Sequence, residues 1–311
     1  MINNEIKAIK EENENYIILK VNIDKESIGK DITFLKQENN FPDYKNFEIN
    51  DIEVFINDKK FPLKYNKLSS YSKNEESKDC EKAQYLSFLL KTSNYFYWNF
   101  SKEGIYIIKI NFKKRVISCA NMFSDCQNII EIDLSHFKSS DVSSCYSMFA
   151  NCHLLKTINF SKLDFKLCES FEKMFLNCEN LIELDVFDFN TANSKSFESM
   201  FHNCKNLIKL DVSNLNTANS KSFKKMLYNC QNLIELDVSH FNTANSKTFE
   251  SMFEECLNLI KIDVRNFNSS ECESVYRMFK NCKNITEIDM INFNLNKLEF
   301  PIFFFYGEKI Q

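Results

Sequence analysis

Residues 184–210 read LDVFDFNTANSKSFESMFHNCKNLIKL, and this stretch decides the fold because its pattern returns along the chain. Its methionine, Met200, recurs every 26 residues, and so does its cysteine. A fixed period of this size is typical of a stacked repeat array, in which each unit buries its apolar side against its neighbours. The period cysteines are Cys126, Cys152, Cys178, Cys204, Cys230, Cys256 and Cys282.

Each repeat contains two different periodicities. Leu184 and Val186 alternate with charged residues, which predicts a short strand with one buried face. Four apolar residues then fall at i, i+3, i+4 and i+7, which predicts a short helix: Phe197, Met200, Phe201 and Cys204. We therefore expect an α/β fold, a leucine-rich-repeat-like solenoid of about seven repeats in which a parallel sheet alternates with short helices.

Apolar columns extend the pattern over the whole array. Three columns are expected to face inward, beginning at Ile132, Leu134 and Phe137 and returning every 26 residues. Asparagines recur two positions after most period cysteines, as at Asn206 and Asn232. Because the chain has only three glycines, we expect these asparagines to adopt the left-handed conformation that ends each helix.

The chain divides into three segments. Residues 1–103 carry no repeat and predict a small β-rich capping domain, with a hairpin turn at Asn57-Asp58-Lys59. Residues 104–299 are the solenoid, and Gly104–Phe112 is expected to supply its first strand. Residues 300–311 are rich in phenylalanine and predict a cap over the last core layer. The expected strands of the first segment are Tyr16–Ile23, Ile52–Asn57, Lys60–Tyr65 and Tyr85–Thr92.

Composition and charge limit the function classes. The formal net charge is −4 and no Lys/Arg block occurs, so we expect no nucleic-acid partner. No run of about 18 apolar residues occurs, so we expect no membrane insertion. Residues 1–16 are charged and resemble no signal peptide, which predicts a cytoplasmic protein.

The cysteines are expected to be buried, reduced thiols. Cys119 and Cys145 occupy the column in which later repeats carry phenylalanine, so cysteine serves there as a hydrophobic residue. Metal or redox chemistry is the alternative, although no CxxC spacing typical of a zinc site occurs. The four histidines are scattered and no glycine-rich phosphate loop exists. We expect no catalytic residues, no cofactor and no enzymatic activity.

The outward columns of the predicted sheet are the candidate binding surface. One is acidic, and three explanations stay open for it: hydrogen bonds to backbone or to the following serine, attraction of a basic partner segment, or cation binding. Another column carries Phe187, Arg265 and Ile291 where serine is usual, and aromatic and arginine side chains often anchor interfaces. The predicted partner-binding residues on the concave face are Asp185, Phe187, Asp211, Asp237, Asp263, Arg265, Asp289 and Ile291.

The motif Leu-x-x-Leu-Asp-Val-Ser-x-Phe followed by Met-Phe-x-x-Cys resembles the 26-residue repeat of the BspA-like leucine-rich-repeat family. This resemblance covers about Gly104 to Phe305 and implies an adhesin or protein-binding module. The leading hypothesis is a non-enzymatic protein–protein interaction module that binds a partner on its concave face. The alternatives are a cell-surface adhesin or host-contact protein exported without a signal peptide, and an enzyme with a site in the N-terminal segment.

Overall fold

A computed structural model describes residues 15–38, 51–62, 64–67, 93–161, 163–187, 189–285 and 288. These residues form thirteen β-strands and no α-helix. The expected strand at Tyr85–Thr92, the C-terminal cap at 300–311, Asp289 and Ile291 lie outside the described residues. The strands are β1 (Tyr16–Ile23), β2 (Asp31–Glu38), β3 (Ile52–Ile56), β4 (Lys59–Phe61), β5 (Lys64–Lys67), β6 (Ser93–Asn99), β7 (Gly104–Phe112), β8 (Ile129–Asp133), β9 (Thr157–Asn159), β10 (Glu183–Asp185), β11 (Lys209–Asp211), β12 (Glu235–Leu236) and β13 (Lys261–Ile262).

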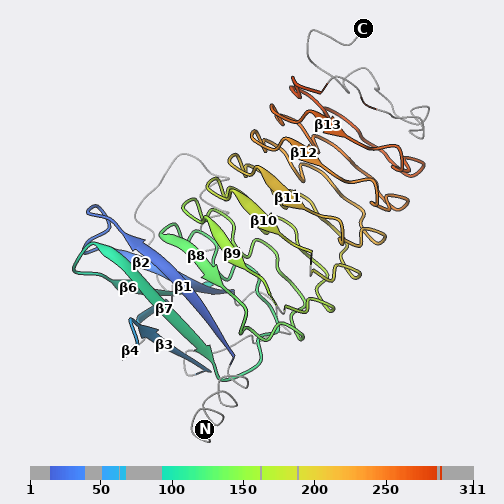
Figure 1. Cartoon of the computed structure of the whole chain (residues 1–311). Helices are drawn as coiled ribbons and strands as arrows, with labels where there is room; N and C mark the ends of the chain where they lie inside the picture. Colours follow the sequence, from blue (N-terminus) through green and yellow to red (C-terminus); the bar gives the residue numbers. More distant parts are fainter. Residues whose placement is uncertain are drawn as a thin grey trace, which may run out of the picture.

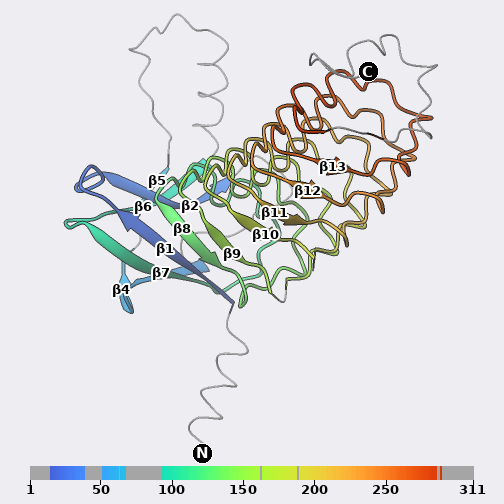
Figure 2. The same cartoon turned by 45° about the horizontal axis from the view of Figure 1, so that its top comes forward.

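A six-stranded sheet joins the N-terminal part of the chain to the repeats. Its order is β4-β3-β7-β1-β8-β9, and a second sheet has the order β2-β6-β5. Figure 1 shows the later repeats as stacked coils that extend away from this N-terminal part. Figure 2 shows the short strands β8 to β13 following one another along one side of the stack. The repeats therefore form an elongated array with one row of short strands.

The first strand of the array is not the expected one. Gly104–Phe112 forms β7, which pairs antiparallel with β1 and β3 rather than with β8. Strand β1 lies between β7 and β8 and pairs antiparallel with both. An antiparallel strand can occupy the free edge of the first repeat, and thereby satisfies backbone groups that would otherwise be exposed. Strand β7 lies about one repeat length before β8 in the sequence, but it does not belong to the repeats.

The predicted hairpin in the N-terminal part is confirmed. Strands β3 and β4 pair antiparallel, with Ile56 opposite Lys59. The two residues between them, Asn57 and Asp58, have φ of 46° and 63°. Positive φ at both central residues is the requirement of the two-residue turn that matches strand twist, and Asn and Asp tolerate it well. Strand β1 also begins and ends where the sequence predicts it.

The inward columns are confirmed. Leu184 pairs in parallel register with Leu210, and Leu236 pairs with Ile262. Residues two positions further along the chain, such as Val186 and Val212, are buried as well. The loop-side column is also buried through the described repeats, at Phe137, Leu163, Phe189, Leu215, Phe241 and Phe267.

The predicted α/β class is wrong, because the described chain is all-β and its helical pattern belongs to turns. Phe197, Met200, Phe201 and Cys204 are fully buried, as an inward-facing helix would place them. The backbone that carries them, however, is a series of turns with positive φ at Ser199 (55°) and again four residues later. A left-handed residue every fourth position interrupts an α-helix, since helical residues all have negative φ.

Hydrogen bonds explain why the chain prefers turns here. The N–H groups of Ser199 and Phe201 donate to carbonyls of the next coil, Lys224 O (2.9 Å) and Met226 O (2.8 Å). The N–H groups between and after them bond locally: Met200 N donates to Phe197 O at 3.2 Å. In an α-helix every such N–H would instead bond to the carbonyl four residues earlier in the same helix. The turns therefore free alternate N–H groups to connect neighbouring coils along the array.

Asparagine provides one of the two left-handed positions in most repeats, but these are not the asparagines expected from the sequence. These asparagines directly precede the period cysteines, as Asn177 (φ of 59°) and Asn203 (61°) do, whereas Asn206 and Asn232 do not have positive φ. The side chains of this column form an amide ladder, in which each Nδ2 donates to the oxygen of the preceding coil. The amide ladder includes Asn151 to Asp125 (2.6 Å), Asn177 to Asn151 (2.7 Å), Asn203 to Asn177 (2.7 Å) and Asn229 to Asn203 (2.7 Å).

The amide ladder ends at a contact with the N-terminal sheets. Asp125 accepts a hydrogen bond from the Lys36 Nζ of β2 at 2.5 Å, and Lys36 N donates to Met122 O at 2.7 Å. Burial alone would raise the pKa of Asp125, but Lys36 and the hydrogen bonds from Asn151 and Ser124 outweigh it and lower the pKa. The Lys36 side chain is itself buried. This ion pair therefore fixes the first coil against the N-terminal part of the chain.

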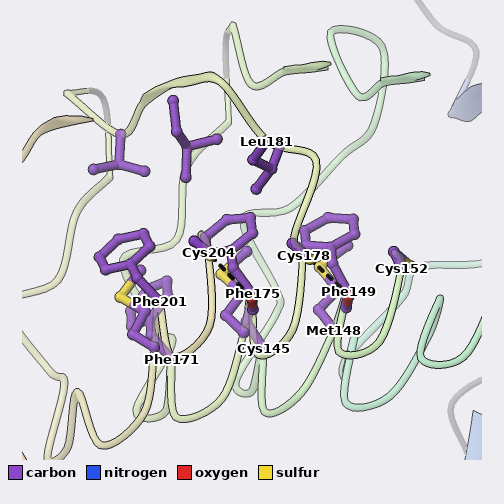
Figure 3. Packing of buried hydrophobic residues seen from close by; sticks show 14 of the residues in the cluster. Cys145, Met148, Phe149, Cys152, Phe171, Phe175, Cys178, Leu181, Phe201 and Cys204 are labelled. Atoms are coloured by element: carbon purple, nitrogen blue, oxygen red, sulfur yellow. Dashed lines mark hydrogen bonds between the residues drawn. The ribbon is translucent and has the colours of Figure 1, made fainter. Parts of the chain in front are cut away.

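The period cysteines lie beside a row of stacked phenylalanines (Figure 3). The rings of Phe149 and Phe175 are 5.5 Å apart and nearly parallel. Each period thiol after the first donates to a carbonyl of the preceding coil, as Cys178 Sγ does to Phe149 O (3.1 Å) and Cys204 Sγ does to Phe175 O (3.2 Å). These thiols both fill the core and bond neighbouring coils.

This burial predicts thiols that react only when the chain unfolds. The described cysteines are all free; ten are buried and Cys282 is partly buried. Burial raises the pKa of the Cys126 and Cys282 thiols to about 12, so little reactive thiolate exists at neutral pH. We expect a thiol reagent to label the native protein far more slowly than the protein in guanidinium. Intact-mass spectrometry measures the number of labelled thiols. Equal labelling in both conditions would contradict the buried arrangement.

Candidate interaction surface

The candidate site is the outward side of the short strands, which we call the strand face. It comprises four outward columns. These are the residue before each of the strands β10–β13, the charged residue that follows it, the aspartate column formed by Asp185, Asp211, Asp237 and Asp263, and the turn residue two positions after each of these aspartates. Strand β10 pairs in register with β11, and β12 with β13, so equivalent residues stand side by side. Glu183 lies opposite Lys209, and Glu235 opposite Lys261. Charges of opposite sign therefore alternate along one column.

The aspartate column has a structural role in the turns. The Oδ1 of Asp211 accepts a hydrogen bond from the backbone N of Ser213 at 2.9 Å, and Asp237 does the same for Ser239. Hydrogen bonds from the serine hydroxyl and backbone lower the pKa of both aspartates. Asp185 and Asp263 accept the equivalent backbone bonds. The first of the three explanations, hydrogen bonds to backbone or to the following serine, is thus observed.

Cation binding has no geometric support in this column. Within the described ranges, no group of three or more His, Cys, Asp or Glu side chains is arranged to hold a metal ion. Calcium prefers six to eight oxygen ligands, whereas each aspartate here uses one oxygen for its own turn. What the column offers to a partner is a row of negative charges.

The two irregular residues in the described part of the next column behave differently. Arg265 is paired within its own coil: its Nε and Nη2 donate to the Asp263 carboxylate, with Nη2–Oδ2 at 2.6 Å. Hydrogen bonds from Arg265, side chain first and then backbone, lower the pKa of Asp263 to about 2. Phe187 is 48% exposed, and its backbone N donates to Asp185 Oδ1. Phe187 is therefore an apolar contact on the strand face, and Arg265 neutralises one aspartate of the column.

This surface also carries an apolar column that was not predicted from the sequence. Four isoleucines, each directly preceding one of the strands β10–β13, are 43–53% exposed. We call them the isoleucine stripe: Ile182, Ile208, Ile234 and Ile260. A signal was available, because each of these repeats has a Leu-Ile pair, and the leucine is the buried member. Two consecutive residues entering a strand rarely both face the core, so one of the pair had to be outside.

Three of the described histidines, His136, His202 and His240, each make local side-chain contacts. His136 stacks on Tyr16 with ring centroids 4.4 Å apart, and a ring nitrogen of His240 lies 2.8 Å from Val212 O. Burial first, and then the charge of Lys225, lower the pKa of His202 to about 4, so its imidazole is neutral at pH 7.

The described part of the chain also contains no helix with the length and apolar character needed to cross a membrane.

Comparison with known proteins gives one family. Its model matches three overlapping stretches, residues 73–181, 117–235 and 206–308, and it is described as Mycoplasma protein of unknown function, DUF285. Neither the comparison with curated proteins nor that with solved structures gave a match. The three matches together span residues 73–308 of 311 and follow one another along the repeats. The chain therefore belongs to the DUF285 family and is a repeat protein.

Proposed function

We propose that the chain is a non-enzymatic protein-interaction module that binds a protein partner through the strand face. The observation that carries this proposal is the isoleucine stripe, in which four isoleucines in consecutive coils are about half exposed. Single exposed apolar residues are common on proteins, but a continuous apolar row is typical of an interaction site. The resemblance of the repeat to BspA-like proteins, which implies a binding module, supports the same reading.

The elongated array also suits binding rather than catalysis. Most of its described phenylalanines, cysteines and methionines are buried in packing between coils, and many of its polar side chains form turns. Stacked repeats present a long surface on which neighbouring coils contribute equivalent residues, as Ile208 and Ile234 do here. We place this module in the cytoplasm, and a surface location is the alternative that the BspA-like resemblance offers. Protease treatment of intact cells distinguishes the two, because only a surface protein would be cleaved.

Site-specific photo-crosslinking in cells tests the binding surface. A photoreactive phenylalanine derivative replaces either Phe187 on the strand face or Leu167, which is exposed to the same degree (47%) but lies in a turn away from the strands. We expect Phe187 to yield a discrete cross-linked protein and Leu167 to yield none. Equal cross-linking at both positions, or a product only at Leu167, would contradict a partner on the strand face.

A further inference from the structure

The isoleucine stripe has a spacing that discriminates between partner shapes. Backbone hydrogen bonds connect its members in two pairs, from Ile208 N to Ile182 O (2.8 Å) and from Ile260 N to Ile234 O (2.9 Å). Hydrogen-bonded neighbours of this kind lie about 4.8 Å apart. The coils of the two pairs are also direct neighbours, since Asn229 donates to Asn203 at 2.7 Å, so at the same step the four isoleucines extend over about 14 Å. An α-helix lying along the array presents one residue per turn at about 5.4 Å and covers about 16 Å in three turns. A β-strand lying in the same direction presents one side chain on a given face about every 6.7 Å. Its side chains therefore fall out of step with the isoleucines.

The charges beside the isoleucine stripe discriminate between partner chemistries. The strand face of these four coils carries three cations, Lys209, Lys261 and Arg265. It carries twice as many carboxylates: Glu183, Asp185, Asp211, Glu235, Asp237 and Asp263. Arg265 is already bound to Asp263, so the central part of the column, at Asp211 and Asp237, keeps the excess negative charge. A partner with basic residues beside its apolar ones would complement this arrangement.

We infer that the strand face binds an amphipathic α-helix that lies along the array, with its apolar edge on the isoleucine stripe and its Lys or Arg residues over the aspartate column. This inference rests on the proposed function and names the class of partner. A second copy of this chain would bring the same acidic column against its own and be repelled. An anionic membrane surface would be repelled for the same reason.

A synthetic peptide tests this pairing on the full chain. The probe is a labelled helical peptide of about 14 residues with one leucine per turn and lysines on the adjoining edge, and a second peptide carries glutamate in place of lysine. We expect fluorescence anisotropy to show binding of the lysine peptide, weakened by added salt, and at least about tenfold weaker binding of the glutamate peptide. Equal binding of the two peptides, or binding of neither, would overturn the inference.

Variants locate the binding. Ile208→Ser combined with Ile234→Ser should weaken binding of the lysine peptide by about tenfold or more, since two apolar contacts are lost. Ile105→Ser combined with Ile107→Ser is the matched control, because these isoleucines of β7 are 49% and 42% exposed but lie in the N-terminal sheet. The control should bind as the unmodified protein does. If both double variants weaken binding to the same extent, the isoleucine stripe is not the docking surface.

Aspartate variants test how much the carboxylate charges contribute to peptide binding, without removing the turn hydrogen bonds. Asp211→Asn combined with Asp237→Asn removes two charges but keeps the turn acceptor, as Asn159 shows by accepting from Ser161 N at 3.1 Å. We expect this variant to remain folded and to lose most of the salt dependence of peptide binding. Unchanged affinity and salt dependence would overturn the role of the column.

Two further measurements test the other possible occupants of the strand face, a second copy of this chain and an anionic membrane. Sedimentation at increasing concentration should show no dimer, and vesicles containing anionic lipid should not retain the protein. A dimer or vesicle binding that Ile208→Ser/Ile234→Ser abolishes would overturn the helix proposal in favour of that occupant. Cross-links from Phe187 without peptide binding would leave the proposed function standing and remove only this inference.

Discussion

Phe175→Ala is expected to lower the free energy of unfolding by about 3–5 kcal/mol, which is the usual cost of emptying a phenylalanine site in a well-packed core. Phe175 is fully buried, and its ring stacks on Phe149 at 5.5 Å and on Phe201 at 5.6 Å. It also meets the edge of Phe160 at 6.0 Å. Because each coil is stabilised mainly by its two neighbours, the cavity weakens two interfaces at once. Urea denaturation followed by far-UV circular dichroism measures the change.

Two control variants make this prediction specific. Phe175→Leu should cost only about 1–1.5 kcal/mol, because Leu227 occupies the same column two coils later and is fully buried there. Phe187→Ala removes the same side chain from an exposed position and should cost about 1 kcal/mol or less. A loss at Phe175→Ala no larger than that at Phe187→Ala would show that the phenylalanine row does not carry the stability of the array.

The sequence was sufficient to predict which side chains face the core, but not the backbone conformation of the repeats. The 26-residue register placed Leu184, Val186, Phe197 and Cys204 in the core, and all four are buried. Burial follows from apolar periodicity, because only the direction of each side chain matters. The same periodicity could not distinguish an α-helix from a chain of turns. Both place residues i, i+3, i+4 and i+7 on one side.

The hydrogen bonds that decide between helix and turns connect residues about 25 apart. Phe201 N reaches Met226 O and Asn203 N reaches Tyr228 O, so the alternative to a helix becomes favourable only when the next coil is present. Local propensity takes no account of such a partner. One signal was visible, however. Asparagine directly precedes five of the seven period cysteines, and asparagine is several-fold enriched at positive φ.

The candidate surface was predicted in part. Asp185, Asp211, Asp237 and Asp263 were assigned to the exposed side and are found there. Their turn hydrogen bonds are one of the three explanations that the sequence leaves open. The isoleucine stripe was missed because isoleucine next to a strand is ordinarily counted as core. The pairing of Arg265 with Asp263 depends on a side-chain rotamer, which no sequence pattern specifies.

Asn203→Val is expected to lower the free energy of unfolding by about 3 kcal/mol, for two separable reasons. Asn203 donates to Asn177 Oδ1 and accepts from Asn229 Nδ2, both at 2.7 Å, and losing these bonds costs about 1 kcal/mol each. Its φ of 61° adds a cost of about 1–2 kcal/mol for a residue other than Gly, Asn or Asp, and a β-branched side chain tolerates it least. Urea denaturation again provides the measurement.

Asn203→Gly separates the two contributions, because glycine removes the amide ladder bonds but adopts positive φ without strain. Its expected loss of about 1–2 kcal/mol reports the ladder alone, and the difference from the valine variant reports the backbone conformation. Asn203→Asp should be milder than valine, since Asp125 holds the equivalent position with φ of 59° and accepts the ladder bond from Asn151. If glycine and valine cost the same, the left-handed turn is not what this residue provides. If glycine costs nothing, the amide ladder sets the register of the coils without stabilising them.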